Sequence, residues 1–294
     1  TPMAVPNWKL FNLIEKAGGV VVGEESCTGS RYYMDLVDES GETVDEMLDA
    51  IAEPFDESAA PALARALCDR RRSVGADGLM LVTRAEGDAD YRMRFYNSDG
   101  SLGEMCGNGA RCFALFAEHL GIGGETKYFD ATDGMHTARI RRAKNRTGEI
   151  ELGMINVSEI RSGKGWWFLN TGVPHYVEFT EELGGVDVKG LGRMIRHDTA
   201  RFPQGTNVNF AEIAGEGEIR MRTYERGVEN ETLACGTGAT AAAIITNYAL
   251  QHETTKYRIT VPGGELHVRF SHEPGTQTYT DIRLTGPARR VFKG

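Results

Sequence analysis

Residues 106–110 read Cys-Gly-Asn-Gly-Ala, and residues 235–239 read Cys-Gly-Thr-Gly-Ala. The likeness between these two parts of the chain continues upstream, where Arg92–Tyr96 matches Arg220–Tyr224 at almost the same spacing. An internal repeat of this length indicates a duplicated structural unit.

Each copy shows the same order of local signals. An alternating stretch predicts a strand, a polar loop follows, and the Cys-Gly-x-Gly turn leads into an Ala-rich apolar stretch that predicts a buried helix. A β-rich segment then ends the copy. In the first copy the strand is Tyr91–Tyr96, the loop Asn97–Glu104, the helix Ala110–Leu120 and the β-rich segment Lys127–Ile140. In the second copy the corresponding elements are Ile219–Tyr224, Glu225–Glu231, Ala239–Leu250 and Lys256–Phe270. We therefore expect an α+β fold of two pseudo-symmetric halves. Each half would be a strand-rich sheet or barrel wrapped around a central helix, with the ligand cleft between the halves.

Domain boundaries follow from the repeat. We expect an atypical N-terminal segment at residues 1–53, an N-terminal half at 54–155 and a C-terminal half at 156–294, whose last strand can return to the first half. Within the N-terminal segment the pattern predicts a helix at Trp8–Lys16, a buried strand at Gly19–Glu24 and a second helix at Val44–Ala52.

Composition excludes several classes of protein. The net charge of −9 argues against a nucleic-acid partner, which would require clustered Lys and Arg. No apolar run is long enough for a membrane span. The five cysteines are odd in number and widely spaced, without a Cys-x-x-Cys pair, so neither a zinc ribbon nor a redox motif is indicated. We expect a cytoplasmic protein with no metal and a small-molecule ligand, and a homodimer remains an option.

Cys106 and Cys235 stand where a loop turns into a helix. The flanking glycines are expected to let the backbone bend and a ligand approach closely. A helix N-terminus favours a thiolate over a thiol and also binds anions such as carboxylate or phosphate. A phosphate loop of the Walker type is excluded because no Gly-Lys-Ser/Thr follows. A catalytic thiol of acyl transfer, or two cysteines that merely pack in a duplicated core, remain alternatives.

Two such turns, one in each half, favour a different chemistry. If the halves face each other, two thiols approach one carbon from opposite sides, as a racemase or epimerase requires. The two helix N-termini would stabilise the carbanion that forms when the α-proton leaves. No cofactor is needed in this scheme.

Longer motifs resemble those of the diaminopimelate epimerase family. Residues 97–101 with 105–112 resemble its first signature, and residues 224–227 with 231–239 resemble its second. Shorter matches lie at residues 75–79, 205–210 and 284–288. The resemblance runs from about Ala62 to the C-terminus and implies cofactor-independent epimerisation of LL-2,6-diaminopimelate to meso-diaminopimelate.

The resemblance also implies roles for individual residues. Cys106 and Cys235 would be the acid/base pair, and Glu225 and His175 would lie near the thiols and tune their protonation. The reacting carboxylate and amine would be held by Gly107, Asn108, Gly236 and Thr237. The distal amino-acid end would be bound by Asn97, Asn207 and Arg226, whose guanidinium suits a carboxylate.

The chain departs from the family pattern at two places. Family members begin with a strand and a Gly-Asn-Asp loop whose asparagine lines the substrate site, and no Gly-Asn-Asp occurs here. Residues 1–53 instead resemble a fragment of a 2-hydroxyacyl-CoA dehydratase subunit, although Cys27 alone cannot hold an iron–sulfur cluster. This segment could replace the missing edge strand or hang loosely on the core. Val173 also stands where many family members have a substrate-binding asparagine.

Two other functions remain open. The chain could be a catalytically impaired chimera that binds an amino acid without proton exchange, because the asparagine loop is absent. It could also be a related racemase of proline, hydroxyproline or another small amino acid. Asn97, Asn207 and Arg226 argue against the racemase, because they suit a substrate with a second charged end.

Overall fold

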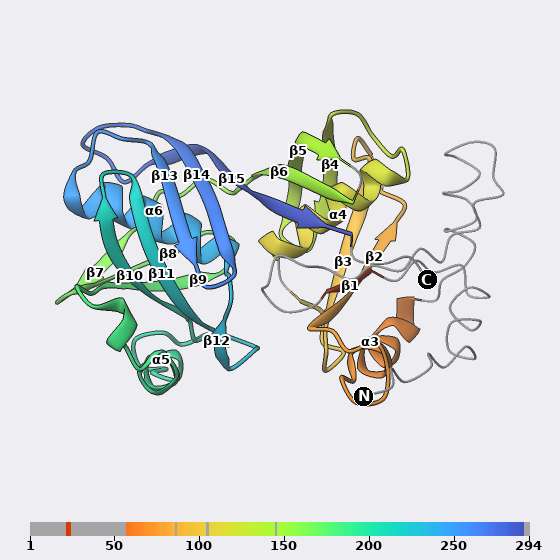
Figure 1. Ribbon diagram of the computed structural model, residues 1–294, viewed down its shortest axis with the longest axis horizontal. Coiled ribbons are helices and arrows are strands. Elements are labelled where there is room, and N and C mark those ends of the chain that lie inside the picture. Colours follow the sequence, from red (N-terminus) through yellow and green to blue (C-terminus); the bar gives the residue numbers. More distant parts are fainter. Residues whose placement is uncertain (1–21, 25–56, 86, 104–105, 145, 291–294) are drawn as a thin grey trace. The chain divides into compact units, whose positions relative to one another are not determined.

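The computed structural model describes residues 22–24, 57–85, 87–103, 106–144 and 146–290 (Figure 1). These residues form two compact units. The first contains the described residues up to Ile150 together with residues 288–290, and the second contains Glu151–Pro287. The predicted helices Trp8–Lys16 and Val44–Ala52, and most of the predicted strand Gly19–Glu24, lie outside the described residues.

The sheet of the first unit has the strand order β1-β2-β3-β4-β5-β6. The strands are β1 (Val22–Glu24), β2 (Gly78–Thr83), β3 (Tyr91–Asn97), β4 (Thr126–Ala131), β5 (Gly134–Lys144) and β6 (Thr147–Gly153, which continues into the second unit). β3 and β4 are parallel, whereas β1–β2, β2–β3 and β4–β5 are antiparallel. β1 therefore adds an edge strand to β2, which is one of the two roles expected for the N-terminal segment.

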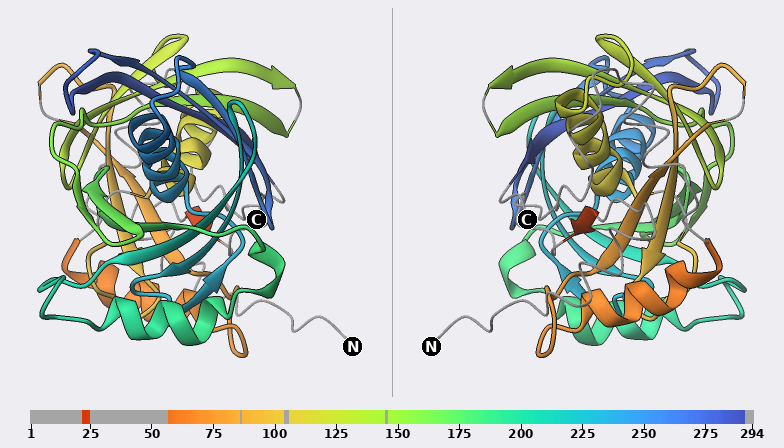
Figure 2. Two further views of the ribbon diagram at one scale, coloured as in Figure 1. Left: turned by 90° about the vertical axis from the view of Figure 1, so that its left-hand side faces the viewer. Right: turned by 90° about the vertical axis from the view of Figure 1, so that its right-hand side faces the viewer.

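Two helices pack on this sheet, α3 (Ala60–Cys68, preceded by the 3₁₀ turn η1, Glu57–Ala59) and α4 (Gly107–His119). The apolar side of α3 packs on β2 and β3, in a cluster of Ala60, Ala64, Leu67, Leu79, Leu81 and Tyr96. Every residue of α4 from Gly107 to Ala117 is buried, which explains why this stretch is apolar on most sides. In the right-hand view of Figure 2, α3 (orange) and α4 (yellow) lie on either side of β2 and β3.

The sheet of the second unit has the order β15-β14-β13-β11-β10-β9-β8-β7, with β12 paired to β11. The strands are β7 (Arg161–Gly163), β8 (Trp166–Asn170), β9 (Pro174–Phe179), β10 (Asn207–Gly215), β11 (Glu218–Glu225), β12 (Asn230–Thr232), β13 (Lys256–Val261), β14 (Gly264–His272) and β15 (Tyr279–Arg289). β9–β10 and β11–β13 are parallel pairs. β2, β3, β4 and β5 thus correspond in order and direction to β10, β11, β13 and β14.

The central strands of the second unit lie between two helices. On one side is α6 (Gly236–Leu250), in which every residue from Gly236 to Asn247 is buried. On the other side α5 (Val188–Arg196) packs through Val188 and Ile195, next to the 3₁₀ turn η2 (Leu183–Gly185). The strand residues that pack against α5 and η2 in this cluster are Tyr176, Val208, Phe210 and Tyr224. The left-hand view of Figure 2 shows α6 (blue) above these strands and α5 (green) below them.

The predicted α+β architecture with a buried helix in each half is confirmed. The predicted helix starts at Cys106 and Cys235 are confirmed, since the helices begin at Gly107 and Gly236, about one turn before their apolar stretches. One local prediction was wrong. The predicted loop Glu225–Glu231 is largely a tight turn, since Asn230–Thr232 folds back and pairs with β11. No helix in the described part of the chain is long and apolar enough to cross a membrane.

Candidate active site

Cys106 and Cys235 are the N-cap residues of the two central helices. Cys106 caps α4 with φ −113° and ψ 107°, and Cys235 caps α6 with φ −127° and ψ 111°. Both backbones are therefore extended just before a helix begins, and each side chain lies beside the unpaired N–H groups of the first turn. The partial positive charge of a helix N-terminus favours a negatively charged sulfur there.

The Cys106 thiol is bound by its own helix. Gly109 donates its backbone N–H to Cys106 Sγ over 3.4 Å, in the manner of an N-cap side chain. Cys106 is partly exposed, whereas its neighbours in α4 are buried. The sulfur therefore lies at the boundary of the core, where a ligand can reach it.

The Cys235 thiol has a different environment. Cys235 is 4% exposed, and its Sγ lies 3.4 Å from the Thr237 hydroxyl. The carbonyl of Thr237 accepts a hydrogen bond of 2.9 Å from the Thr171 hydroxyl, which ties the first turn of α6 to the segment before β9. The two thiols are thus chemically inequivalent, although their helices occupy equivalent places in the repeat.

Asn108 is oriented by a buried arginine that lies within the first signature but was not among the predicted site residues. Arg111 donates to the Gly107 carbonyl over 3.0 Å and to Asn108 Oδ1 over 2.8 Å. Both Asn108 and Arg111 are almost fully buried. The guanidinium therefore fixes which end of the Asn108 amide faces away from it. The available signal was a charged residue at the start of the largely apolar stretch Ala110–Leu120, whose other charged residue, Glu118, stands near its end.

Asn207 joins the ends of three strands in the second unit. Its Oδ1 accepts the backbone N–H of Arg226 over 2.8 Å, and its Nδ2 donates to the Pro174 carbonyl over 3.2 Å. His175 is the register partner of Asn207 across β9 and β10. These contacts bring His175, Asn207 and Arg226 together at one end of the sheet.

His175 is fully buried and electrically neutral near pH 7. Burial, with a smaller contribution from the Arg226 charge, lowers the pKa of its imidazole to about 3. Its Nδ1 lies 3.1 Å from the amide nitrogen of Asn209, a residue of the matched stretch 205–210 that was not among the predicted site residues. His175 can therefore take part in hydrogen bonds but carries no positive charge near pH 7.

The remaining predicted residues end strands or begin a helix. Glu225 is the last residue of β11, and the Arg226 guanidinium donates to the Gln204 carbonyl over 3.1 Å. Asn97 ends β3, where its amide donates to the Ser101 hydroxyl over 3.0 Å. Gly236 is the first residue of α6, and its carbonyl accepts from the Thr240 hydroxyl. Asn97, Cys106, Gly107 and Asn108 lie in the first unit, and the other predicted site residues lie in the second.

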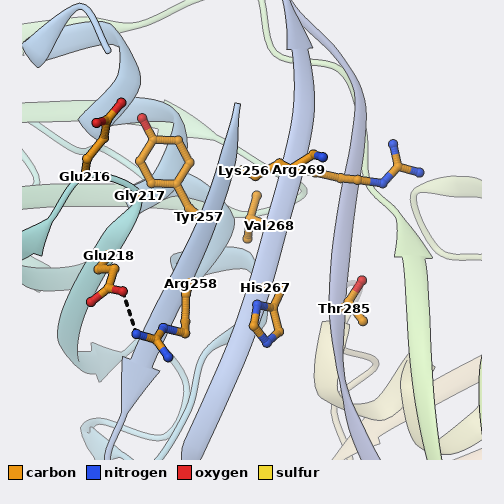
Figure 3. A pocket seen from close by; sticks show the side chains of 10 residues that line it. All are labelled: Glu216, Gly217, Glu218, Lys256, Tyr257, Arg258, His267, Val268, Arg269 and Thr285. Atoms are coloured by element: carbon orange, nitrogen blue, oxygen red, sulfur yellow. Dashed lines mark hydrogen bonds and ion pairs between the residues drawn. The ribbon is translucent and has the colours of Figure 1, made fainter. Parts of the chain in front are cut away.

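A separate surface hollow of about 350 Å³ lies over β11, β13 and β14 (Figure 3). It contains none of the predicted site residues. Its Arg258 guanidinium is paired with Glu218 over 2.6 Å, and Arg269 is paired with Asp281 over 3.1 Å. No cysteine lines this hollow, so it is not a candidate for two-thiol chemistry. Among the described residues, no group of three or more His, Cys, Asp or Glu side chains could hold a metal ion.

Comparison with known proteins identifies two family matches. The family model described as diaminopimelate epimerase matches residues 47–155 and 167–291. The model described as 2-hydroxyglutaryl-CoA dehydratase, D-component, matches residues 1–87, a longer stretch than the 1–53 expected from the sequence. The two matches overlap between residues 47 and 87.

Individual relatives belong to the same family, and solved structures have a similar fold. The diaminopimelate epimerase of Flavobacterium psychrophilum is 44% identical over 232 residues, which cover 79% of this chain and 88% of the relative. That of Chlorobaculum tepidum is 42% identical over 240 residues, covering 78% and 89%. Among solved structures, a probable proline racemase from Agrobacterium radiobacter has a TM-score of 0.61 at 18% identity, covering 93% of each chain. A Bacillus anthracis phenazine biosynthesis protein of the PhzF family has a TM-score of 0.63 at 13% identity, covering 93% and 97%. These two structures share the fold.

Proposed function

The chain belongs to the diaminopimelate epimerase family, and on this premise we propose that it converts LL-2,6-diaminopimelate to meso-diaminopimelate without a cofactor. The family resemblance predicted from the sequence motifs is confirmed by these matches. The observation that carries the proposal is that the two repeated helices each begin with a cysteine as N-cap.

In the proposed reaction the two cysteines act on opposite faces of one α-carbon. The thiolate of one removes the α-proton, so that an S–H bond forms as the C–H bond breaks. The thiol of the other then gives its proton to the opposite face of the carbanion and becomes the thiolate. Atoms and charge balance over the cycle, and the reverse direction exchanges the roles of Cys106 and Cys235.

The carbanion requires stabilisation, because the α-proton of a free amino acid is very weakly acidic. Backbone N–H groups at the starts of α4 and α6 are suited to the α-carboxylate, whose charge grows as the proton leaves. We assign this role to the first turns that contain Gly107, Asn108, Gly236 and Thr237. His175 and Glu225 would support the thiols, His175 as a neutral hydrogen-bonding group.

Substrate choice is assigned to Asn97, Asn207 and Arg226. A planar guanidinium pairs bidentately with a carboxylate, which a second amino-acid end provides. Asn207 holds the backbone of Arg226 by its 2.8 Å hydrogen bond and so positions that guanidinium. Proline offers no second charged end, so the fold shared with the proline racemase does not make proline the better substrate.

The absent Gly-Asn-Asp motif and Val173 predict weaker binding than in family members that carry both asparagines. Val173 is 9% exposed and lies two residues after the Thr171 that contacts α6. An apolar side chain at this place cannot replace the amide contact. We expect a raised KM with the two-cysteine chemistry retained.

Epimerisation assays of single cysteine variants test the proposal. Cys106→Ala and Cys235→Ala should each lower kcat by at least about 100-fold, because each removes an acid/base group. Cys112→Ala is the matched control, since Cys112 is a buried cysteine inside the helix that Cys106 caps and should be dispensable. Full activity of either catalytic variant would reject the scheme. Calorimetric binding of diaminopimelate by a wild-type chain that does not epimerise it would instead indicate the binding-only alternative.

A further inference from the structure

We propose that Asn209 is a positioning residue of this site, whose amide holds His175 in the neutral tautomer that carries its proton on Nε2. His175 then presents a hydrogen-bond donor beside the catalytic helix α6. This inference rests on the function proposed above.

Asn209 is the third residue of β10 and is fully buried. Its Nδ2 is 3.1 Å from His175 Nδ1 and 2.8 Å from the Tyr176 carbonyl oxygen. Its Oδ1 accepts a 3.0 Å hydrogen bond from the Thr223 hydroxyl on the neighbouring strand β11. Three contacts therefore fix one short side chain.

These contacts determine which way the amide points. A carbonyl oxygen can only accept, so the Asn209 atom that faces Tyr176 must be the NH₂ nitrogen. The second hydrogen of that NH₂ group is directed at His175 Nδ1, which must then be unprotonated. In a neutral imidazole the proton consequently lies on Nε2. The low pKa of His175 agrees with a ring that stays neutral.

The Nε2 atom of His175 is buried and has no hydrogen-bond partner among the described residues. A buried donor without a partner is unfavourable in a folded protein and usually has a functional reason. A ligand that accepts a hydrogen bond would satisfy it.

Asn209 also borders the start of α6. A methyl group placed on Gly238 would lie 2.4 Å from Asn209 Oδ1 and 3.3 Å from Cys235 Sγ. The Asn209 amide and the Cys235 sulfur are thus both next to the same glycine. The histidine, the asparagine and the thiol form one packed group within the second unit.

The test is the protonation pattern of His175, measured by ¹⁵N NMR on the full chain labelled at histidine. In the wild type we expect the proton on Nε2. Asn209→Asp keeps the shape of the side chain but can only accept, so Nδ1 should become protonated and kcat should fall by about tenfold or more. Asn247→Asp is the matched control. Asn247 is a buried asparagine in α6 whose Nδ2 donates to two carbonyls and whose Oδ1 accepts from Tyr279. Its change to Asp therefore replaces the same kind of buried amide at a different place in the fold.

A wild-type ring that carries its proton on Nδ1 would overturn the inference. So would an Asn209→Asp variant with protonated Nδ1 and unchanged kcat, or one whose kcat falls no further than that of Asn247→Asp. If Asn209→Asp does not fold, two spectra still test the inference. One is the ¹⁵N spectrum of the wild type, and the other is that of Thr223→Val, which removes only the donor to Asn209 Oδ1. A chain with the expected tautomer but no epimerisation would contradict the proposed function and leave the assignment of Asn209 standing.

Discussion

Position in the chain separates the two proposed catalytic thiols from the other described cysteines. Cys106 and Cys235 precede helices, whereas Cys68 is the last residue of α3. Burial, together with the Asp77 carboxylate, raises the pKa of the Cys68 thiol to about 11, so this group stays protonated and unreactive at neutral pH. A cysteine at the C-terminal end of a helix thus serves as a buried packing residue, whereas a cysteine at an N-cap is suited to catalysis.

The low pKa of His175 predicts a dependence of stability on pH. The imidazole titrates near 6.5 when unfolded and near 3 when folded, so the unfolded state binds more protons between these values. Below pH 6.5 the unfolded chain takes up a proton at His175 that the folded chain does not. The free energy of unfolding is therefore highest above pH 6.5 and falls as the pH is lowered toward 3. His175→Gln should remove this contribution and reduce the slope of unfolding free energy against pH by up to about 1.4 kcal/mol per pH unit. Denaturant titrations from pH 4 to pH 8 measure it, and equal slopes in both proteins would contradict the buried neutral ring.

At the scale of elements, the first turn of α6 is pressed against β10 at Gly238. We expected the glycines of both motifs to let the backbone bend. None of Gly107, Gly109, Gly236 and Gly238 has a positive φ angle, so no backbone conformation reserved for glycine is used at these positions. Close approach is the reason that the structure gives for Gly238, since Asn209 occupies the space that a side chain would need.

Gly238→Ala should therefore destabilise the protein although alanine is the better helix former. The added methyl would meet Asn209 Oδ1 at 2.4 Å, and Asn209 cannot move away because three hydrogen bonds hold it. We expect a loss of about 1–3 kcal/mol in unfolding free energy, as for other overpacked cores, and reduced activity. Gly184→Ala, where a methyl meets nothing within 4 Å, should change stability by less than about 0.5 kcal/mol. Wild-type stability and activity in Gly238→Ala would disprove this packing.

Other elements could not be predicted from local sequence. The helix α5 escaped notice because Gly190 and Gly192 lower its helix propensity. Gly192 is needed there, since a Cβ at that position would lie 2.4 Å from the Cβ of Tyr224. The strand β12 was also missed, because its pairing with β11 depends on a turn and not on an alternating pattern. Tertiary packing decided both cases.

At the scale of the whole molecule, the repeat was sufficient to predict two similar halves with a buried helix in each. The motifs also identified Cys106, Cys235 and the residues beside them. Arg111, Asn209 and Thr223 lie within the matched stretches, but their roles could not be predicted, because each acts through a hydrogen bond to another side chain. A motif identifies a residue, whereas the hydrogen bonds that this residue makes are visible only in the structure.

The N-terminal part of the chain combines two likenesses. The dehydratase-like match reaches residue 87, while the epimerase match begins at residue 47, so they share a segment that includes α3 and β2. Within that segment α3 packs on β2 and β3 as part of the first unit. The part of the overlap that the structure describes is therefore integrated in the epimerase fold.

The central claim is that two different thiols act on the two faces of one carbon, and the isotope pattern of the first turnovers in D₂O tests it most directly. Starting from LL-diaminopimelate, the meso product should carry deuterium at the inverted α-carbon, because the donating thiol has exchanged with solvent. The recovered LL-substrate should still carry protium at that stage, since the accepting thiol does not return a solvent deuteron before product forms. Protium transferred from substrate to product, or deuterium appearing equally early in the recovered substrate, would show that a single group serves both faces and would contradict the account.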